Sequence, residues 1–233
     1  MLPLGSQLIF IGDVDQLPPV GAGQPFLDLI RSKKIVVSRL TKQFRQGSDS
    51  VIPNVAKAIN KGELIEFSND FANSGFSFVE VEKGQIVEKI IEVVDFFTGN
   101  KNGIVDFDRT QILSPMRRYS SGLINLNSIM QKKYNPNGEK VFSKIEGEKE
   151  VKFCAGDKVI CTQNDYDIDV RNGDIGYVVN KVGKNIRVEF DGEMKLFHNN
   201  KSDYLDLAYA ITVHKSQGSE YPNVVMPIVD DHR

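Results

Sequence analysis

The chain changes character twice along its length, and this limits the folds that it can adopt. Between about residues 139 and 204 it holds short runs typical of β-strands, at 158–162, 175–179, 186–190 and 194–197. Turns rich in Gly, Asn and Asp separate these runs, including Asn172-Gly173-Asp174 and Asp191-Gly192. Several short strands at this spacing predict a small β-barrel. The segments on both sides mix helix and strand patterns, so the barrel is expected to interrupt an α/β domain.

The flanking segments alternate amphipathic helices with short apolar strands. Helices are predicted over 25–31, 50–61, 85–97 and 121–134. In the second of these, Pro53 lies in the first turn and Gly62 follows the last turn, as helix ends prefer. Strands are predicted at 7–11, 35–37, 76–81, 111–113 and 224–226. The first strand is a continuous apolar run, which is typical of a strand buried on both faces of a parallel sheet.

Composition excludes several classes of protein. The 233 residues are 40% hydrophobic, as in ordinary globular proteins, and the longest apolar runs are far too short to cross a bilayer. The N-terminus has neither the basic nor the extended apolar region of a secretory signal. The only two cysteines, Cys154 and Cys161, match no zinc pattern and form no disulfide framework. We therefore expect a cytoplasmic protein without a membrane partner or a bound metal of its own.

Net charge is −2, from 29 basic and 31 acidic side chains. A protein that binds nucleic acid through a global positive field would be more basic, so any such site must be local. Candidate basic pairs are Lys33-Lys34, Lys42 with Arg45, Arg117-Arg118 and Lys132-Lys133. Each pair, taken alone, is also compatible with an ordinary solvated surface.

Two polar segments carry groups suited to phosphate chemistry. Residues 12–23 (GDVDQLPPVGAG) directly follow the first apolar run, and ligands bind at the carboxyl ends of parallel strands. An amide there, such as Gln16, can sense a terminal phosphate or orient a water; alternatively the segment is a polar loop stiffened by prolines. In residues 40–46 (LTKQFRQ), Arg45 can stabilise charge on a transferring phosphoryl group, or it is an ordinary surface arginine.

A third segment, residues 208–222 (AYAITVHKSQGSEYP), places hydroxyl, imidazole and amide groups around a glycine. Such side chains, together with main-chain N–H groups, suit contacts to a phosphate backbone. His214 within it is also compatible with a structural histidine whose hydrogen bonds are satisfied inside the protein. The segment by itself therefore leaves both interpretations open.

The order and wording of the three segments resemble the superfamily 1 helicases, most closely the RecD-like group that moves 5′ to 3′ on DNA. Residues 12–23 match the family's motif III, 40–46 its motif IV, and 212–220 (TVHKSQGSE) its motif V. Residues 114–136 are similar to the second motor lobe. Residues 156–160 and 172–176 are similar to an SH3-like barrel inserted in that lobe. The resemblance covers essentially the whole chain.

The resemblance implies a site for each of two ligands. For ATP with Mg²⁺ it implies Gln16 as γ-phosphate sensor and Arg45 as arginine finger, with Asp13, Gly218 and Glu220 also at the nucleotide. Single-stranded DNA is then expected to lie on the residues of motif V and on the basic pair after residue 114: Thr212, His214, Lys215, Ser216, Arg117 and Arg118. The implied fold is α/β, a RecA-like, P-loop-NTPase-type second motor domain with an inserted small SH3-like β-barrel.

Parts of a complete motor are missing from the sequence. A P-loop needs G-x-x-x-x-G-K-[ST], and no Gly-Lys-Ser or Gly-Lys-Thr occurs. The Asp-Glu pair that would hold Mg²⁺ is also missing, and so is motif VI. We therefore expect a piece of a longer protein that is inactive alone and needs the N-terminal motor domain. The expected divisions are a first-motor remnant (1–37), the second motor domain (38–138 and 205–233) and the barrel (139–204).

Other functions remain open on the sequence. The barrel can serve a non-catalytic protein- or nucleic-acid-binding module in which the motifs are relics, because SH3-like barrels host many functions. A third possibility is a related superfamily 1 motor that acts on RNA or within a conjugative relaxase. For a DNA helicase we expect a role in repair or recombination, alone or with the subunits of a nuclease complex.

Overall fold

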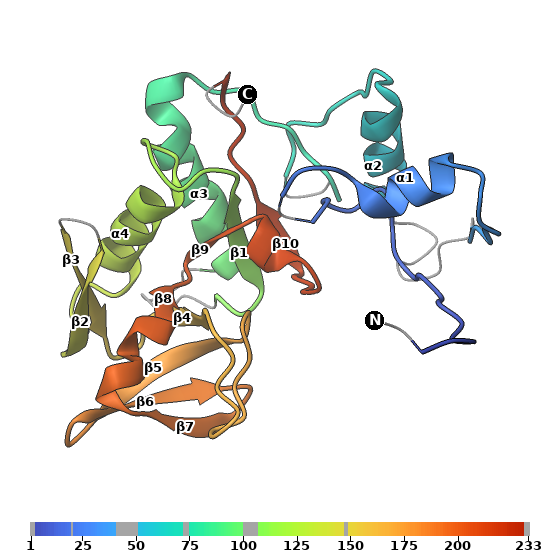
Figure 1. Cartoon of the computed structure of the whole chain (residues 1–233). Helices are drawn as coiled ribbons and strands as arrows, with labels where there is room; N and C mark the ends of the chain where they lie inside the picture. Colours follow the sequence, from blue (N-terminus) through green and yellow to red (C-terminus); the bar gives the residue numbers. More distant parts are fainter. Residues whose placement is uncertain are drawn as a thin grey trace. The chain divides into compact units, whose positions relative to one another are not determined.

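The computed structural model describes residues 3–19, 21–40, 51–71, 75–99, 107–146 and 149–230. The chain divides into two compact units, Met1–Glu80 and Val81–Arg233, and Figure 1 shows the helices and strands of each. Within the described ranges, no helix combines the length and apolar character needed to cross a membrane.

The first unit contains two helices, α1 (Pro25–Arg31) and α2 (Ile52–Lys61), which confirm the helices predicted there. Pro53 stands in the first turn of α2, where an N–H has no partner within the helix in any case. Gly62 ends α2 with φ +69°, in the left-handed region that glycine enters without steric cost.

The strands predicted in the first unit are wrong. Residues 7–11 form no strand, with Ile9 79% and Ile11 94% exposed. Residues 35–37 form none either, and within 76–81 only Ser77 makes an isolated bridge, to Ser68. An apolar run is buried on both faces only when neighbouring strands and helices cover it. No strand lies beside these runs among the described residues of the unit. Residues 7–11 and 35–37 therefore stay exposed, and residues 76–80 are exposed or half-buried.

The second unit is built on a parallel sheet of three strands in the order β10-β1-β9. The central strand β1 (Thr110–Ser114) is the most buried, and β9 (Ala210–Thr212) and β10 (Asn223–Val225) flank it. After a short 3₁₀ turn, η1 (Lys83–Gln85), come the helices α3 (Ile86–Thr98) and α4 (Leu123–Tyr134). The apolar stripes of the two helices and the strand β1 supply core residues with no exposed surface: Val94, Ile112, Leu126 and Met130.

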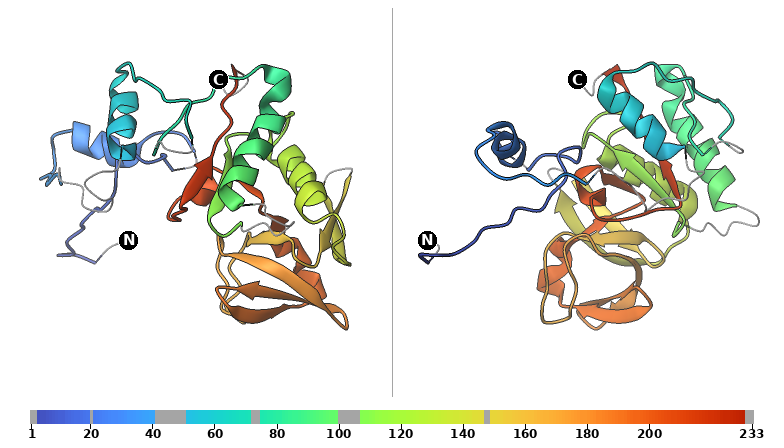
Figure 2. Two further views of the ribbon diagram at one scale, coloured as in Figure 1. Left: turned by 180° about the vertical axis from the view of Figure 1, so that it is seen from behind. Right: turned by 90° about the vertical axis from the view of Figure 1, so that its right-hand side faces the viewer.

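Between α4 and β9 the chain leaves the parallel sheet and forms two antiparallel sheets. One is a hairpin of β2 (Lys140–Glu146) and β3 (Lys149–Cys154), in which the rings of Phe142 and Phe153 stack 4.3 Å apart. The other has the order β7-β6-β5-β4-β8, and the views in Figure 2 place β5, β6 and β7 at the end of the unit away from α3. Its strands are β4 (Lys158–Cys161), β5 (Ile175–Val182), β6 (Asn185–Phe190), β7 (Glu193–Phe197) and β8 (Leu205–Leu207).

These sheets confirm the predicted all-β interruption of an α/β domain. Asp191 and Gly192, both with positive φ, form the two-residue turn between β6 and β7. The predicted barrel is not closed, because β7 and β8 are the edges of the sheet and do not pair with each other. β8 has only three residues, and it uses them to pair with β4. A 3₁₀ segment, η2 (Asn199–Tyr204), joins β7 to β8. The hairpin of β2 and β3 was not predicted.

Candidate nucleic-acid and nucleotide site

The carboxyl ends of β1 and β9 meet at one edge of the parallel sheet. Ser114, the last residue of β1, is in register with Thr212, the last residue of β9. Ligands of open α/β sheets bind at this edge. The segments that leave the two strands, residues 115–122 and 213–220, carry five of the six residues that the sequence assigned to DNA. The sixth, Thr212, is the last residue of β9. The structure therefore brings the predicted DNA set together.

The loop after β1 is held by hydrogen bonds to its own backbone. The hydroxyl of Ser114 lies 2.9 Å from the carbonyl of Met116 and 3.0 Å from that of Ser121. At the start of α4, the N–H groups of Leu123 and Ile124 donate to the carbonyls of Met116 and Arg117. The loop thus satisfies donors that a helix start leaves without partners. Arg117 and Arg118 remain exposed on it.

The turn after β9 is η3 (His214–Ser216). The hydroxyl of Thr212 accepts a hydrogen bond from the N–H of Lys215 at 3.2 Å, and the hydroxyl of Ser216 donates to the carbonyl of Val213 at 2.8 Å. His214 is exposed, whereas Thr212 and Ser216 are half-buried. Gly218 has φ +83°, in the region that favours glycine, and it lets the chain leave the turn.

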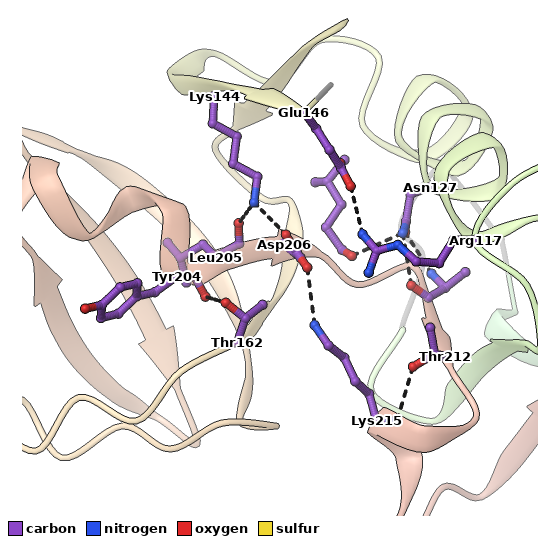
Figure 3. A network of polar contacts seen from close by, with 12 residues as sticks. Arg117, Asn127, Lys144, Glu146, Thr162, Tyr204, Leu205, Asp206, Thr212 and Lys215 are labelled. Atoms are coloured by element: carbon purple, nitrogen blue, oxygen red, sulfur yellow. Dashed lines mark hydrogen bonds and ion pairs between the residues drawn. The ribbon is translucent and has the colours of Figure 1, made fainter. Parts of the chain in front are cut away.

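Lys215 belongs to a cluster of three charges that links the turn to the β region, which comprises the two antiparallel sheets of β2 to β8 (Figure 3). The carboxylate of Asp206 on β8 lies 2.5 Å from Lys144 of β2 and 3.2 Å from Lys215. Lys144 also donates to the carbonyl of Leu205 at 2.7 Å. Burial alone raises the pKa of Asp206, but the hydrogen bond and charge of Lys144, followed by those of Lys215, outweigh it and lower the pKa. The carboxylate is therefore held in its charged form.

A second ion pair joins the loop after β1 to the hairpin. Arg117 donates to Glu146, at the end of β2, at 2.9 Å, and the Arg117 side chain stays 55% exposed. An exposed pair of this kind contributes little to stability and exchanges readily with other anions. Arg117 thus remains available to a phosphate, whereas Lys215, which is 25% exposed, is held more firmly by Asp206.

The short connection from β8 to β9, residues 208–209, is fixed by buried polar side chains. The amide of Asn127 on α4 donates to the carbonyls of Leu207 and Ala210 at 3.1 and 3.0 Å, and its oxygen accepts from the Ala210 N–H at 2.9 Å. Gln111 on β1 donates to the carbonyls of Ala208 and Tyr209. The β region is therefore joined to motif V by a connection that both α4 and β1 hold in place.

A buried carboxylate, Asp157, anchors the same connection to the β region. Its oxygens accept hydrogen bonds from Tyr209 at 2.9 Å, Asn135 at 2.7 Å, Gln131 at 2.6 Å and the Cys154 N–H at 2.6 Å. Burial, followed by the negative charge of Asp157, raises the pKa of Tyr209. Asp157, Asn127, Gln111 and Asp206 were not among the predicted site residues. The sequence signal that could have found Asn127 is a polar residue beside Leu126 on the apolar stripe of α4.

The predicted nucleotide residues are divided between the two units. In the first unit the backbone N–H of Asp15 donates to Asp13 at 2.9 Å, and the amide of Gln16 lies 3.5 Å from the other oxygen of Asp13. Both side chains line a hollow of about 90 Å³ that Phe26 also lines. Ligand pockets begin at roughly 300 Å³. Gly218 and Glu220 are exposed in the second unit, and Arg45 lies outside the described residues.

The described residues do not fit Mg²⁺-ATP on their own. Across the described ranges, no group of three or more His, Cys, Asp or Glu side chains lies close enough to hold a metal. Burial raises the pKa of Cys154 and of Cys161, which disfavours the thiolate form that binds metals. The hollow beside Gln16 is too small for a nucleotide. The roles of Gln16, Asp13, Gly218 and Glu220 therefore remain predictions.

Comparison with known proteins identifies the family. Residues 126–190 match the ATP-dependent RecD-like DNA helicase SH3 domain, 2–76 match an AAA domain, and 207–233 match the UvrD-like helicase C-terminal domain. Over 99% of its length the chain is 32% identical to the ATP-dependent RecD2 DNA helicase of Deinococcus radiodurans. The chain belongs to the RecD-like helicases. This membership confirms the family that the three motifs indicated.

Other relatives of this RecD-like chain have different names and roles. It is 27% identical over 97% of its length to the RecBCD enzyme subunit RecD of Buchnera aphidicola. It is 29% identical over 94% of its length to the conjugal transfer protein TraA of Agrobacterium fabrum. The chain spans 30% of the length of the Deinococcus relative, 46% of the Buchnera relative and 20% of TraA. Most of each relative therefore lies outside the match.

Solved structures of Pif1 helicases share the fold. The Bacteroides Pif1 helicase in complex with ADP-AlF3 and single-stranded DNA matches with a TM-score of 0.54 at 18% identity, over 94% of this chain and 55% of that chain. Bacteroides Pif1 bound to single-stranded DNA matches with a TM-score of 0.52, over 95% and 56% of the two chains. With the SH3 match, this likeness confirms the predicted fold, a RecA-like second motor domain with an SH3-like insertion.

Proposed function

We propose that this RecD-like chain forms the second motor lobe of an ATP-dependent helicase that moves 5′ to 3′ on single-stranded DNA. The observation that carries the proposal is the meeting of the loop after β1 and the motif V turn at one edge of the parallel sheet. That edge offers arginine, hydroxyl and imidazole groups from two segments almost 100 residues apart in the chain. Groups of these kinds contact phosphates and position a protein on DNA without reading its sequence.

The charge distribution supports a local contact to DNA. Arg117 and Arg118 are exposed at the edge, whereas Asp206 is 24% exposed and already paired with two lysines. The positive charge that remains unpaired among the described residues of these two segments therefore comes from Arg118 and, once Glu146 is displaced, from Arg117. A strand that binds here releases few counterions, so its affinity depends on salt with a modest slope.

For the nucleotide, the proposal assigns Gln16 as γ-phosphate sensor and Arg45 as arginine finger, with Asp13, Gly218 and Glu220 nearby. ATP and Mg²⁺ then need a P-loop and an Asp-Glu pair, neither of which occurs in the 233 residues. We accordingly propose that the chain works with an N-terminal motor domain and does not turn over ATP alone. A helicase-like ATPase rate from the purified 233-residue chain contradicts this part of the proposal.

The proposed division follows the sequence: 1–37 with the first motor domain, 38–138 and 205–233 as the second, and 139–204 as the insertion. Strands from both sides of 139–204 make up the β10-β1-β9 sheet, which supports an insertion. A role in repair or recombination, with nuclease-complex subunits as candidate partners, is supported by relatives whose names include RecBCD enzyme subunit RecD.

Fluorescence anisotropy with a labelled oligo-dT strand tests the DNA site. We expect the chain to bind more weakly as salt rises, and Thr212→Ala and His214→Ala each to weaken binding. His198→Ala is the matched control, because His198 is exposed on the β region, after β7. Binding that is absent at low salt, or indifferent to both substitutions, refutes the DNA-facing edge and favours a protein-binding role for the SH3-like region.

A further inference from the structure

Tyr119, in the loop after β1, adopts a backbone conformation that tyrosine rarely takes. Its φ is +74°, in the left-handed region where a Cβ atom is crowded by the backbone. The other non-glycine residues with positive φ in the described chain are Lys33, Asp169 and Asp191. Aspartate tolerates this region better than most residues, because its short polar side chain can bond locally. A bulky aromatic residue does not, so this conformation costs free energy that glycine would avoid.

Contacts of the Tyr119 side chain do not offset that cost. The residue is 68% exposed. Its ring stacks on no other aromatic ring among the described residues, and within those residues its hydroxyl makes no hydrogen bond. Strained residues persist where the surrounding structure dictates their conformation, and they cluster at ligand sites. The conformation of Tyr119 is therefore not explained by contacts within the described residues, and a bound ligand is the alternative explanation.

The turn around Tyr119 dictates the conformation. The carbonyl of Tyr119 accepts from the Gly122 N–H at 3.1 Å, and the carbonyl of Ser120 accepts from the Asn125 amide at 2.7 Å. A Cβ at position 122 would lie 1.9 Å from the carbonyl oxygen of Arg118, so only glycine fits there. Hydrogen bonds to the carbonyls of Tyr119 and Ser120 thus fix the turn, and the tyrosine stays exposed on it.

The neighbours of Tyr119 match one class of ligand. Arg117 and Arg118 precede it directly, both exposed, and the loop lies at the sheet edge that also carries Thr212. Cationic side chains beside an exposed aromatic ring are the combination with which proteins hold single strands, because every base offers a π-face for stacking. In a duplex the bases already stack on each other, so such a ring favours unpaired bases.

We propose that Tyr119 is a stacking platform for an unpaired base of the strand that occupies the sheet edge. This inference rests on the proposed DNA site and adds a contact to bases beside the contacts to phosphates. Because stacking does not read hydrogen-bonding groups, the contact accepts any base. It also explains why a tyrosine occupies a position with positive φ, where glycine would remove the backbone strain.

Two single-stranded oligonucleotides of equal length and charge test the inference: oligo-dT and an abasic strand with the same sugar-phosphate backbone but no bases. We expect Tyr119→Ala and Tyr119→Gly to weaken oligo-dT binding about five-fold or more, which corresponds to the lower end of base stacking energies. Neither substitution changes the affinity for the abasic strand. Tyr119→Phe keeps the ring and retains wild-type affinity for both strands. Thr212→Ala, which removes a proposed phosphate contact, is expected to weaken binding to both strands alike.

Thermal melting of the same variants separates binding from folding. Tyr119→Gly is expected to melt above wild type, because it relieves the positive φ, and yet to bind oligo-dT less well. Equal oligo-dT affinity of wild type and Tyr119→Ala, with Thr212→Ala still weakened, overturns the stacking role and leaves the DNA site standing. Equal weakening of both strands by Tyr119→Ala also overturns it. If the wild-type chain binds neither strand, the proposed DNA site fails and the inference fails with it.

Discussion

Asp157 offers the sharpest test of how the β region is attached to the motor lobe. The residue has no exposed surface, and its two oxygens accept four hydrogen bonds. All four partners are donors: the amides of Gln131 and Asn135, the hydroxyl of Tyr209 and the N–H of Cys154. The substitution Asp157→Asn keeps the size of the side chain and replaces one acceptor oxygen with an NH₂ group, which faces donors.

The loss of stability in Asp157→Asn depends on which of the two oxygen positions the new NH₂ group takes. The N–H of Cys154 belongs to the backbone and cannot turn away, whereas the hydroxyl of Tyr209 can rotate and accept a hydrogen bond. The cheaper orientation therefore places the new oxygen near Cys154 and Gln131. The amide of Asn135 then loses its hydrogen bond to residue 157 and keeps the one to the carbonyl of Ala155. Loss of one or two hydrogen bonds to a charged group costs about 2–5 kcal/mol. For a chain of this size, about 3 kcal/mol lowers the melting temperature by roughly 6–12 °C.

Urea denaturation followed by circular dichroism measures this difference directly. Asp203→Asn is the matched control, because Asp203 is exposed on η2, and we expect it to change the free energy of unfolding by less than about 0.5 kcal/mol. If Asp157→Asn loses less than about 1 kcal/mol, Asp157 does not act as an acceptor for four donors, and the reasoning is refuted.

Two further predictions concern the same connection. Asn127→Ala removes three hydrogen bonds from a buried site and leaves the Ala210 N–H unsatisfied. We expect the free energy of unfolding, measured by urea denaturation, to fall by about 3 kcal/mol, against less than about 1 kcal/mol for the control Asn125→Ala. Similar losses in both variants contradict this prediction. Because the pKa of Asp206 is lowered in the folded state, its contribution is present above the ordinary value near 3.8 and is lost as the pH falls through the lower folded pKa. Asp206→Asn should thus flatten the fall in stability below about pH 4, and an unchanged acid profile rules this out.

Local features of the chain could be predicted from the sequence because they depend on neighbours a few residues away. The helices α3 and α4 followed from apolar stripes, and the ends of α2 from Pro53 and Gly62. The strands β4 to β7 followed from short β-type runs between turns, such as Asp191-Gly192. The three motifs identified the family, because each motif specifies the residue type at many consecutive positions.

The tertiary structure decided which residues have partners, because strand pairing and hydrogen bonding join positions that are far apart in the chain. The run 7–11 has the pattern of a buried strand, yet no neighbouring strand covers it among the described residues of its own unit. Lys215 was predicted as a DNA contact from its motif, and only the fold shows that Asp206 already holds it. Tyr119 is an ordinary tyrosine in the sequence; its positive φ and exposure arise from a turn that Gly122 and the start of α4 impose.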